Sequence, residues 1–196
     1  MLCKKCAKCG DLELLKIFRH HGFPWNETVI NAAAEGGYID IIQWCIENGC
    51  YFDINSCAEA AASKSQLKVL QWLLSEELKV TQKLLNSSAR SGQFEAVQWC
   101  VDNGASVSER TCKEAARSGN LKLLQWCLPS TDGKMTCDIS SGAARSGNVQ
   151  MLKWCLENKC PTNWEMQINS FLSFNPRMIE YTYLLENNHS KGYSTI

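Results

Sequence analysis

The chain has 196 residues, and its 20 lysines and arginines balance 20 aspartates and glutamates. A formal net charge of zero lacks the basic surplus that most nucleic-acid binders need. No apolar run approaches the ~20 residues of a membrane span, and 45% hydrophobic content excludes wholesale disorder. We therefore expect neither a nucleic acid nor a membrane as a partner.

The opening sequence MLCKKCAKCGDLELL has no uninterrupted apolar segment, so it does not predict a secretory signal. Without a signal, the 12 cysteines are better interpreted as free thiols in a reducing compartment than as a disulfide framework. A cytoplasmic location follows as the expectation.

Tryptophan recurs along the chain at a nearly constant interval. The five positions, 28, 27, 27 and 28 residues apart, are Trp44, Trp72, Trp99, Trp126 and Trp154. Similar strings surround them, such as IDIIQWCIENG, FEAVQWCVDNG and VQMLKWCLENK. LELLKIFRHHG is an earlier copy with Ile17 in the tryptophan position. A fixed period of this length is the signature of a repeat architecture.

Each repeat is predicted to contain a short helix A, a glycine turn, a longer helix B and a glycine stop. A residue suited to cap helix A recurs with the same period, and these residues are Asn26, Asp53, Thr81, Ser108 and Thr136. The repeats span about 1–25, 26–52, 53–80, 81–107, 108–135, 136–162 and 163–187. They form one array over 1–187, and we expect the tail 188–196 to be disordered.

The fifth repeat illustrates the pattern. Cys112, Ala115 and Ala116 should face inward from helix A. Gly119 can adopt the left-handed conformation that ends this helix, and Asn120 caps helix B. The apolar stripe of NLKLLQWCL is broad, so one repeat cannot bury it without neighbours. No segment shows the alternation of apolar and polar residues that a strand would have. We therefore predict an all-α solenoid of about seven helix-turn-helix repeats.

The strings AARSGNLKLLQW at 115–126 and AARSGNVQMLKW at 143–154 resemble the core of ankyrin repeats, and the resemblance covers nearly the whole chain. HGFPWNET and NKCPTNWE are similar to the short, Trp- and Cys-rich ankyrin repeats of giant DNA viruses and some protists. That resemblance implies a protein-binding array without cofactor, in the host cytoplasm if the source is viral.

The sequence departs from the usual ankyrin pattern in two ways. The family period is about 33 residues, whereas here it is 27 or 28. Only three residues separate Gly104 from Ser108, too few for the family's β-hairpin, and the T-P-L-H-x-A motif is absent. Shortened loops should replace the hairpins, and binding should shift to the concave face formed by helices A.

Cysteine placement raises a second possibility. Cys3, Cys6 and Cys9 form C-x2-C-x2-C, a weak candidate for a metal site. Aligning LCKKCAKCG with TCKEAARSG places the first two in core positions of helix A, which favours packing. The other cysteines recur with the period, and no histidine partner for a catalytic thiol emerges. We therefore predict no metal and no enzymatic activity.

Trp25 precedes a helix cap, as Phe52, Val80, Val107 and Met135 do in later repeats. Such residues usually pack on the helix that follows as a hydrophobic staple. Trp25 is larger than a staple needs, so it is also a candidate partner contact.

Three arginines share one position at the end of helix A: Arg90, Arg117 and Arg145. Neighbouring helices in a stack lie ~10 Å apart, so these side chains should form a row with Lys8 at one end and Glu35 interrupting it. Guanidinium groups in a row suit the acidic side chains of a partner, although they could also be merely solvated. The proposed contact set is Arg90, Ser91, Lys113, Arg117, Ser118, Arg145 and Ser146, with Trp25.

The leading functional hypothesis is therefore a non-catalytic, monomeric protein-interaction module. One alternative is a substrate-recruiting subunit of a larger complex such as a ubiquitin ligase, which would need a docking element outside the repeats. Another is a metal or redox sensor that uses the N-terminal thiols.

Overall fold

The computed structural model of the protein describes residues 2–161, and all regular structure in this range is helical. The predicted repeat 163–187 and the tail 188–196 lie outside the described residues. Helices A are α1 (Leu2–Cys9), α3 (Glu27–Gly36), α5 (Ile54–Ala62), α7 (Gln82–Arg90), α9 (Glu109–Ser118) and α11 (Cys137–Ser146). Helices B are α2 (Leu12–His20), α4 (Ile39–Glu47), α6 (Leu67–Ser75), α8 (Phe94–Asp102), α10 (Leu121–Cys127) and α12 (Val149–Glu157). The prediction of paired helices in an all-α chain is confirmed.

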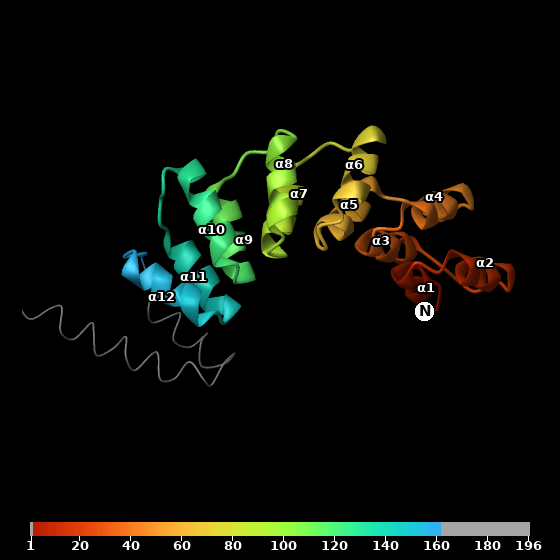
Figure 1. Cartoon of the computed structure of the whole chain (residues 1–196), viewed down its shortest axis with the longest axis horizontal. Coiled ribbons are helices and arrows are strands. Elements are labelled where there is room, and N and C mark those ends of the chain that lie inside the picture. The colour runs from red at the N-terminus through yellow and green to blue at the C-terminus, as the bar shows by residue number, and fades with distance from the viewer. Residues whose placement is uncertain (1, 162–196) are drawn as a thin grey trace, which may run out of the picture. The chain divides into compact units, whose positions relative to one another are not determined.

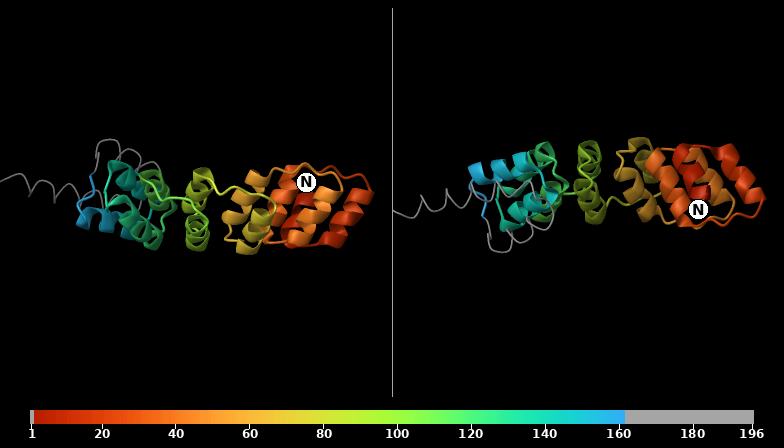
Figure 2. Two further views of the ribbon diagram at one scale, coloured as in Figure 1. Left: turned by 90° about the horizontal axis from the view of Figure 1, so that it is seen from above. Right: turned by 90° about the horizontal axis from the view of Figure 1, so that it is seen from below.

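The chain divides into two compact units, 1–107 and 108–196, at the predicted boundary between the fourth and fifth repeats. In the first unit, α1, α3, α5 and α7 pack in sequence, and each helix B lies against its own helix A. In the second unit, α9 packs against α11, and α10 and α12 cover them. Figures 1 and 2 show these pairs and the short turns that join them.

The predicted caps begin helices A. The side chains of Asn26, Asp53, Thr81 and Ser108 each accept a hydrogen bond from a backbone N–H in the first turn. Ser108 forms a full capping box with Thr111, whereas Thr136 makes no side-chain cap bond. Polar residues at this position therefore satisfy N–H groups that would otherwise lack partners at the helix start.

The stop of helix B has a constant backbone geometry despite a variable sequence. Cys50 N donates to Cys45 O at 2.9 Å, and Cys160 N donates to Cys155 O at 2.9 Å. The left-handed residue before the donor is Gly49 in the first case and Lys159 (φ 54°) in the second. The closing hydrogen bond thus stabilises a conformation that glycine adopts most easily.

The core consists of equivalent positions in successive repeats. In helix B they are Ile41, Ile42 and Cys45, then Val69, Leu70 and Leu73, then Ala96, Val97 and Cys100, then Leu123, Leu124 and Cys127, then Met151, Leu152 and Cys155, all buried. The periodic cysteines are therefore packing residues, as predicted. The tryptophans that define the period are only half-buried, because they lie at the edge of this core.

Candidate functional site

The ends of helices A form the surface that the sequence analysis selected. Lys8 and Glu35 occupy the same position in the first two repeats, and Lys8 Nζ lies 3.5 Å from Glu35 Oε2. Residues in this position of neighbouring repeats are therefore close enough to act on one ligand.

Arg117 and Arg145 are both exposed in the second compact unit, each as the penultimate residue of its helix. Their helices approach closely: a Cβ on Gly142 of α11 would lie 2.9 Å from Lys113 O and 3.1 Å from Arg117 N of α9. Neither guanidinium has a carboxylate within ion-pair distance among residues 2–161. Arg90 ends α7 in the first unit and is also exposed.

The serines beside these arginines have local roles. Ser118 Oγ donates to Ala115 O at 2.7 Å and accepts from Asn120 N at 3.2 Å. Ser146 Oγ makes the same bonds to Ala143 O and from Asn148 N, at 2.7 and 3.1 Å. Each hydroxyl thus joins the end of helix A to the turn, and its donor is already used. Ser91 Oγ, which is exposed, donates to Ser87 O at 3.1 Å.

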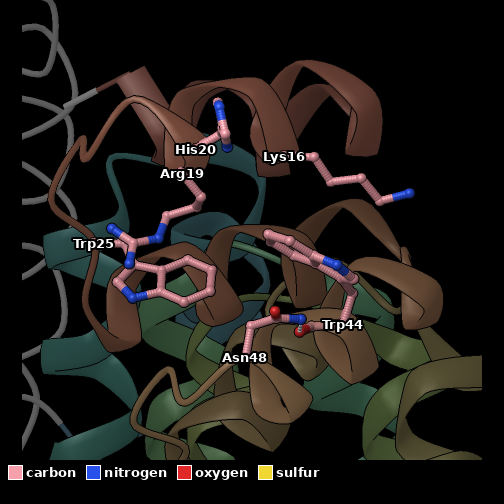
Figure 3. A pocket seen from close by; sticks show the side chains of 6 residues that line it. All are labelled: Lys16, Arg19, His20, Trp25, Trp44 and Asn48. Carbon is pink, nitrogen blue, oxygen red and sulfur yellow. Dashed lines mark hydrogen bonds between the residues drawn. The ribbon is translucent and has the colours of Figure 1, made fainter.

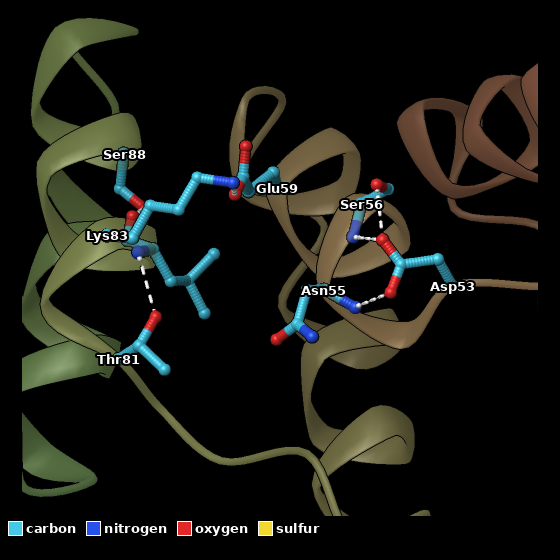
Figure 4. A network of polar contacts seen from close by, with 8 residues as sticks. Asp53, Asn55, Ser56, Glu59, Thr81, Lys83 and Ser88 are labelled. Carbon is cyan, nitrogen blue, oxygen red and sulfur yellow. Dashed lines mark hydrogen bonds and ion pairs between the residues drawn. The ribbon is translucent and has the colours of Figure 1, made fainter.

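Some lysines on helices A form ion pairs to the neighbouring repeat. Lys113 Nζ lies 2.8 Å from Asp138 Oδ1, so this predicted contact residue already has an acidic partner. In the first unit Lys83 Nζ lies 2.6 Å from Glu59 Oε1, and the hydrogen bond from Lys83 to Glu59 raises the pKa of the ammonium (Figure 4). Exposed pairs of this kind contribute little to stability but align adjacent helices.

Asp53 illustrates how the cap position affects charge. Its carboxylate accepts from the Ser56 hydroxyl and from the backbone N–H groups of Ser56 and Asn55 (Figure 4). These hydrogen bonds, led by the one from the Ser56 hydroxyl, lower the pKa of Asp53. The negative charge is thereby fixed at the start of α5, where the helix dipole favours it.

Trp25 lies away from the helix A ends, between helices B. Its ring meets that of Trp44 edge-on at 5.5 Å, and the Arg19 guanidinium lies 4.2 Å from its ring centre. Lys16, Arg19, His20, Trp25, Trp44 and Asn48 line a pocket of about 260 Å³ between α2 and α4 (Figure 3). The size of Trp25 predicts a partner contact, but the sequence does not predict the pocket, because Arg19 and Trp44 meet Trp25 only in the fold.

The N-terminal thiols do not converge. Cys3 and Cys6 are buried in α1, as the alignment of repeats predicts, whereas Cys9 is exposed. No group of three or more His, Cys, Asp or Glu residues within 2–161 is arranged to hold a metal ion. Burial raises the pKa of Cys6, which does not favour the thiolate that a metal requires.

One pair of buried thiols has unusual electrostatics. A hydrogen bond between Cys112 and Cys127 lowers the pKa of Cys112 to about 7 and raises that of Cys127. Both side chains are fully buried between α9 and α10, so neither can meet a substrate. The pair is therefore interpreted as part of the core.

No family model matches this sequence, and no curated protein matches it. Among solved structures it is similar to the ankyrin repeat domain of human ASB11, with a TM-score of 0.53 and 16% identity over 79% of this chain and 82% of that chain. Similarity at this identity supports the ankyrin-repeat fold. It does not support the narrower resemblance to viral and protist repeats. No helix among the described residues is both long and apolar enough to cross a membrane.

Proposed function

We propose that the chain is a non-catalytic protein-interaction module that binds an acidic surface of a partner protein on the ends of helices A. The observation that carries the proposal is the pair Arg117 and Arg145, exposed on adjacent helices without a carboxylate partner within 2–161. A guanidinium group presents a planar fork of donors that matches a carboxylate.

The remaining members of the proposed contact set have graded roles. Arg90 ends α7 in the first compact unit, next to Ser91, and is proposed as a further contact residue. Ser118 and Ser146 border the arginines, but their hydroxyl donors are used internally, and the charge of Lys113 is paired with Asp138, so these residues contribute surface shape more than charge. The core fixes these backbones before binding, which reduces the conformational entropy lost on association. A standard interface would cover ~800 Å² on this side.

An array of this kind fits a monomer in the cytoplasm, where free thiols persist. The described part of the chain contains 12 cysteines with no disulfide between them, and 10 of these are buried, as free thiols in a reducing environment would be. Trp25 is proposed as a contact of a separate site, treated below.

The test is affinity purification from the native cell with a tagged full chain. We expect the triple variant Arg90→Glu, Arg117→Glu and Arg145→Glu to lose the proteins that the wild type captures. The matched control makes the same charge change on exposed helix B lysines, with Lys68→Glu, Lys122→Glu and Lys153→Glu, and should retain them. Equal capture by the arginine variant and the wild type would remove the basis for this surface.

The identity of the captured proteins distinguishes the recruiting-subunit alternative. A recruiting subunit would capture the components of a larger complex together with its client, and the components would remain bound to the arginine variant. A simple interaction module would lose its captured proteins together.

A further inference from the structure

The pocket between α2 and α4 carries an inference about a second, separate site. Lys16, Arg19 and His20 come from the last two turns of α2, Trp44 and Asn48 from the end of α4, and Trp25 from the loop between α2 and α3. Figure 3 shows these side chains surrounding one opening. All six belong to the first compact unit.

The composition of this pocket departs from the repeat. The position of Arg19, two residues after the tryptophan slot, holds Ile46, Leu74, Val101, Leu128 and Leu156 in the later repeats. The position of Trp25 holds Phe52, Val80, Val107 and Met135. The later repeats therefore stack with an apolar residue at the position of Arg19. A cation there, next to the largest aromatic side chain of the series, is not explained by packing.

Arg19 is held in place before any ligand arrives. Its guanidinium stacks over Trp25 at 4.2 Å, and Nη1 donates to Phe23 O. The Phe23 ring contacts that of Phe18 at 5.0 Å, which fixes the loop that carries the acceptor. A guanidinium has five N–H donors, so the bond to Phe23 leaves donors for a ligand. A side chain fixed in this way loses little entropy on binding.

The charge of the pocket is positive. No carboxylate lies within ion-pair distance of Arg19 among residues 2–161, whereas Lys16 Nζ pairs with the exposed Glu13 at 2.7 Å. The Arg19 charge also acts on the interior. Burial raises the pKa of both Cys45 and Cys50, and the Arg19 charge opposes a part of that rise. The positive charge of Arg19 therefore also affects these two buried thiols.

The size of the pocket limits its ligand. About 260 Å³ is below the range of roughly 300–1,000 Å³ that holds cofactors and drug-sized molecules. It can hold one or two amino-acid side chains. Two indole rings, from Trp25 and Trp44, provide an apolar wall that a bare inorganic anion would not use.

We propose that this pocket binds a partner peptide through an Asp or Glu carboxylate at Arg19 and an adjacent aromatic side chain against Trp25 and Trp44. The proposal is independent of the helix A surface, since no residue is shared. It adds to the basic helix A surface a second site, which combines a contact for a carboxylate with a contact for an aromatic side chain. Asn48, whose Nδ2 donates to Trp44 O at 2.8 Å, borders the apolar wall and keeps its amide oriented.

The experiment is an NMR titration of the full chain that follows the indole N–H signals of its 7 tryptophans. Substitution to Phe assigns Trp25 and Trp44. The probes are two peptides with blocked ends, Gly-Gly-Glu-Phe-Gly-Gly and the matched Gly-Gly-Gln-Phe-Gly-Gly. We expect the glutamate peptide to shift these two signals and to bind at least fivefold more tightly than the glutamine peptide.

Variants separate the pocket from the rest of the molecule. Arg19→Gln should abolish the difference between the two peptides, whereas Lys68→Gln, an equal charge change on α6, should leave it intact. Unchanged positions of the other five indole signals would show that Arg19→Gln is folded. Arg19→Lys, which keeps the charge but not the fork, should bind with intermediate affinity.

Three results would overturn the proposal: no shift at Trp25 and Trp44, equal binding of the two peptides, or unchanged binding by Arg19→Gln. Inorganic phosphate at the same concentration is the final arm. Shifts as large as those from the glutamate peptide would identify a general anion site and contradict recognition of an acidic peptide. Loss of partner capture by the arginine-row variant has no bearing on these signals, so the two proposals fail independently.

Discussion

Replacing Gly142 by alanine sets local helix preference against packing between repeats. Gly142 lies inside α11 and is buried against α9. In an exposed helix, changing glycine to alanine stabilises by about 1 kcal/mol, because glycine has more conformational freedom to lose on folding. Local propensity alone therefore predicts a more stable protein.

The structure predicts the opposite sign. The added Cβ would lie 2.9 Å from Lys113 O, 3.1 Å from the Ala116 Cβ and 3.1 Å from Arg117 N. Two of these neighbours are backbone atoms, so relief requires α9 and α11 to separate. Overpacking of this kind costs about 1–3 kcal/mol. After the propensity gain of about 1 kcal/mol is subtracted, we expect a net loss of up to about 2 kcal/mol in the free energy of unfolding.

The assay is urea unfolding followed by far-UV circular dichroism. Ser141→Ala is the matched control, because it introduces the same residue at the half-exposed adjacent position and should change stability by less than about 0.5 kcal/mol. An unfolding midpoint for Gly142→Ala above that of the wild type would refute the close approach of α9 and α11.

Two further predictions concern thiols and caps. Burial raises the pKa of Cys57 from its ordinary value of 9.0 to about 12. The neutral buried thiol therefore contributes to the free energy of unfolding, and this contribution is fully present below pH 9 and is lost as the pH rises toward 12. Urea unfolding under reducing conditions should show that the free energy of unfolding falls between pH 9 and 10. In Cys57→Ala the slope of this free energy against pH should be smaller by up to about 1.4 kcal/mol per pH unit. An unchanged slope would contradict the raised pKa of Cys57. Ser108→Ala should cost about 1 kcal/mol by removing the capping box, whereas Thr136→Ala should cost clearly less because Thr136 makes no cap bond. Thermal melts of the two variants make the comparison, and equal losses would show that the cap bond is unimportant.

The period of the sequence predicted the helices because burial recurs at fixed positions. Residues such as Leu124 and Cys127 pack against equivalent residues in every neighbour, so the pattern reports the contact directly. The left-handed stop of helix B was predicted from glycine alone. Glu77 and Lys159 adopt it as well, since the hydrogen bond that closes the helix stabilises this backbone even without glycine.

The candidate sites were less accessible to sequence reasoning. The shared position of the arginines predicts that they align, and this alignment stays a prediction. The use of Lys113 in an ion pair with Asp138 depends on a partner 25 residues away, which no local pattern marks. The α2–α4 pocket was missed for the same reason, although Arg19 is a charged residue in a position that is apolar in later repeats, and this exception could have revealed it.

Site-specific photocrosslinking in the native cell tests the central claim most directly. A photoreactive phenylalanine analogue replaces Ser91 at the helix A ends in one variant and Gln125, exposed on helix B, in another. We expect covalent adducts with a partner protein from the first position and none from the second. Adducts at Gln125 alone, or at neither position, would contradict binding on the helix A surface.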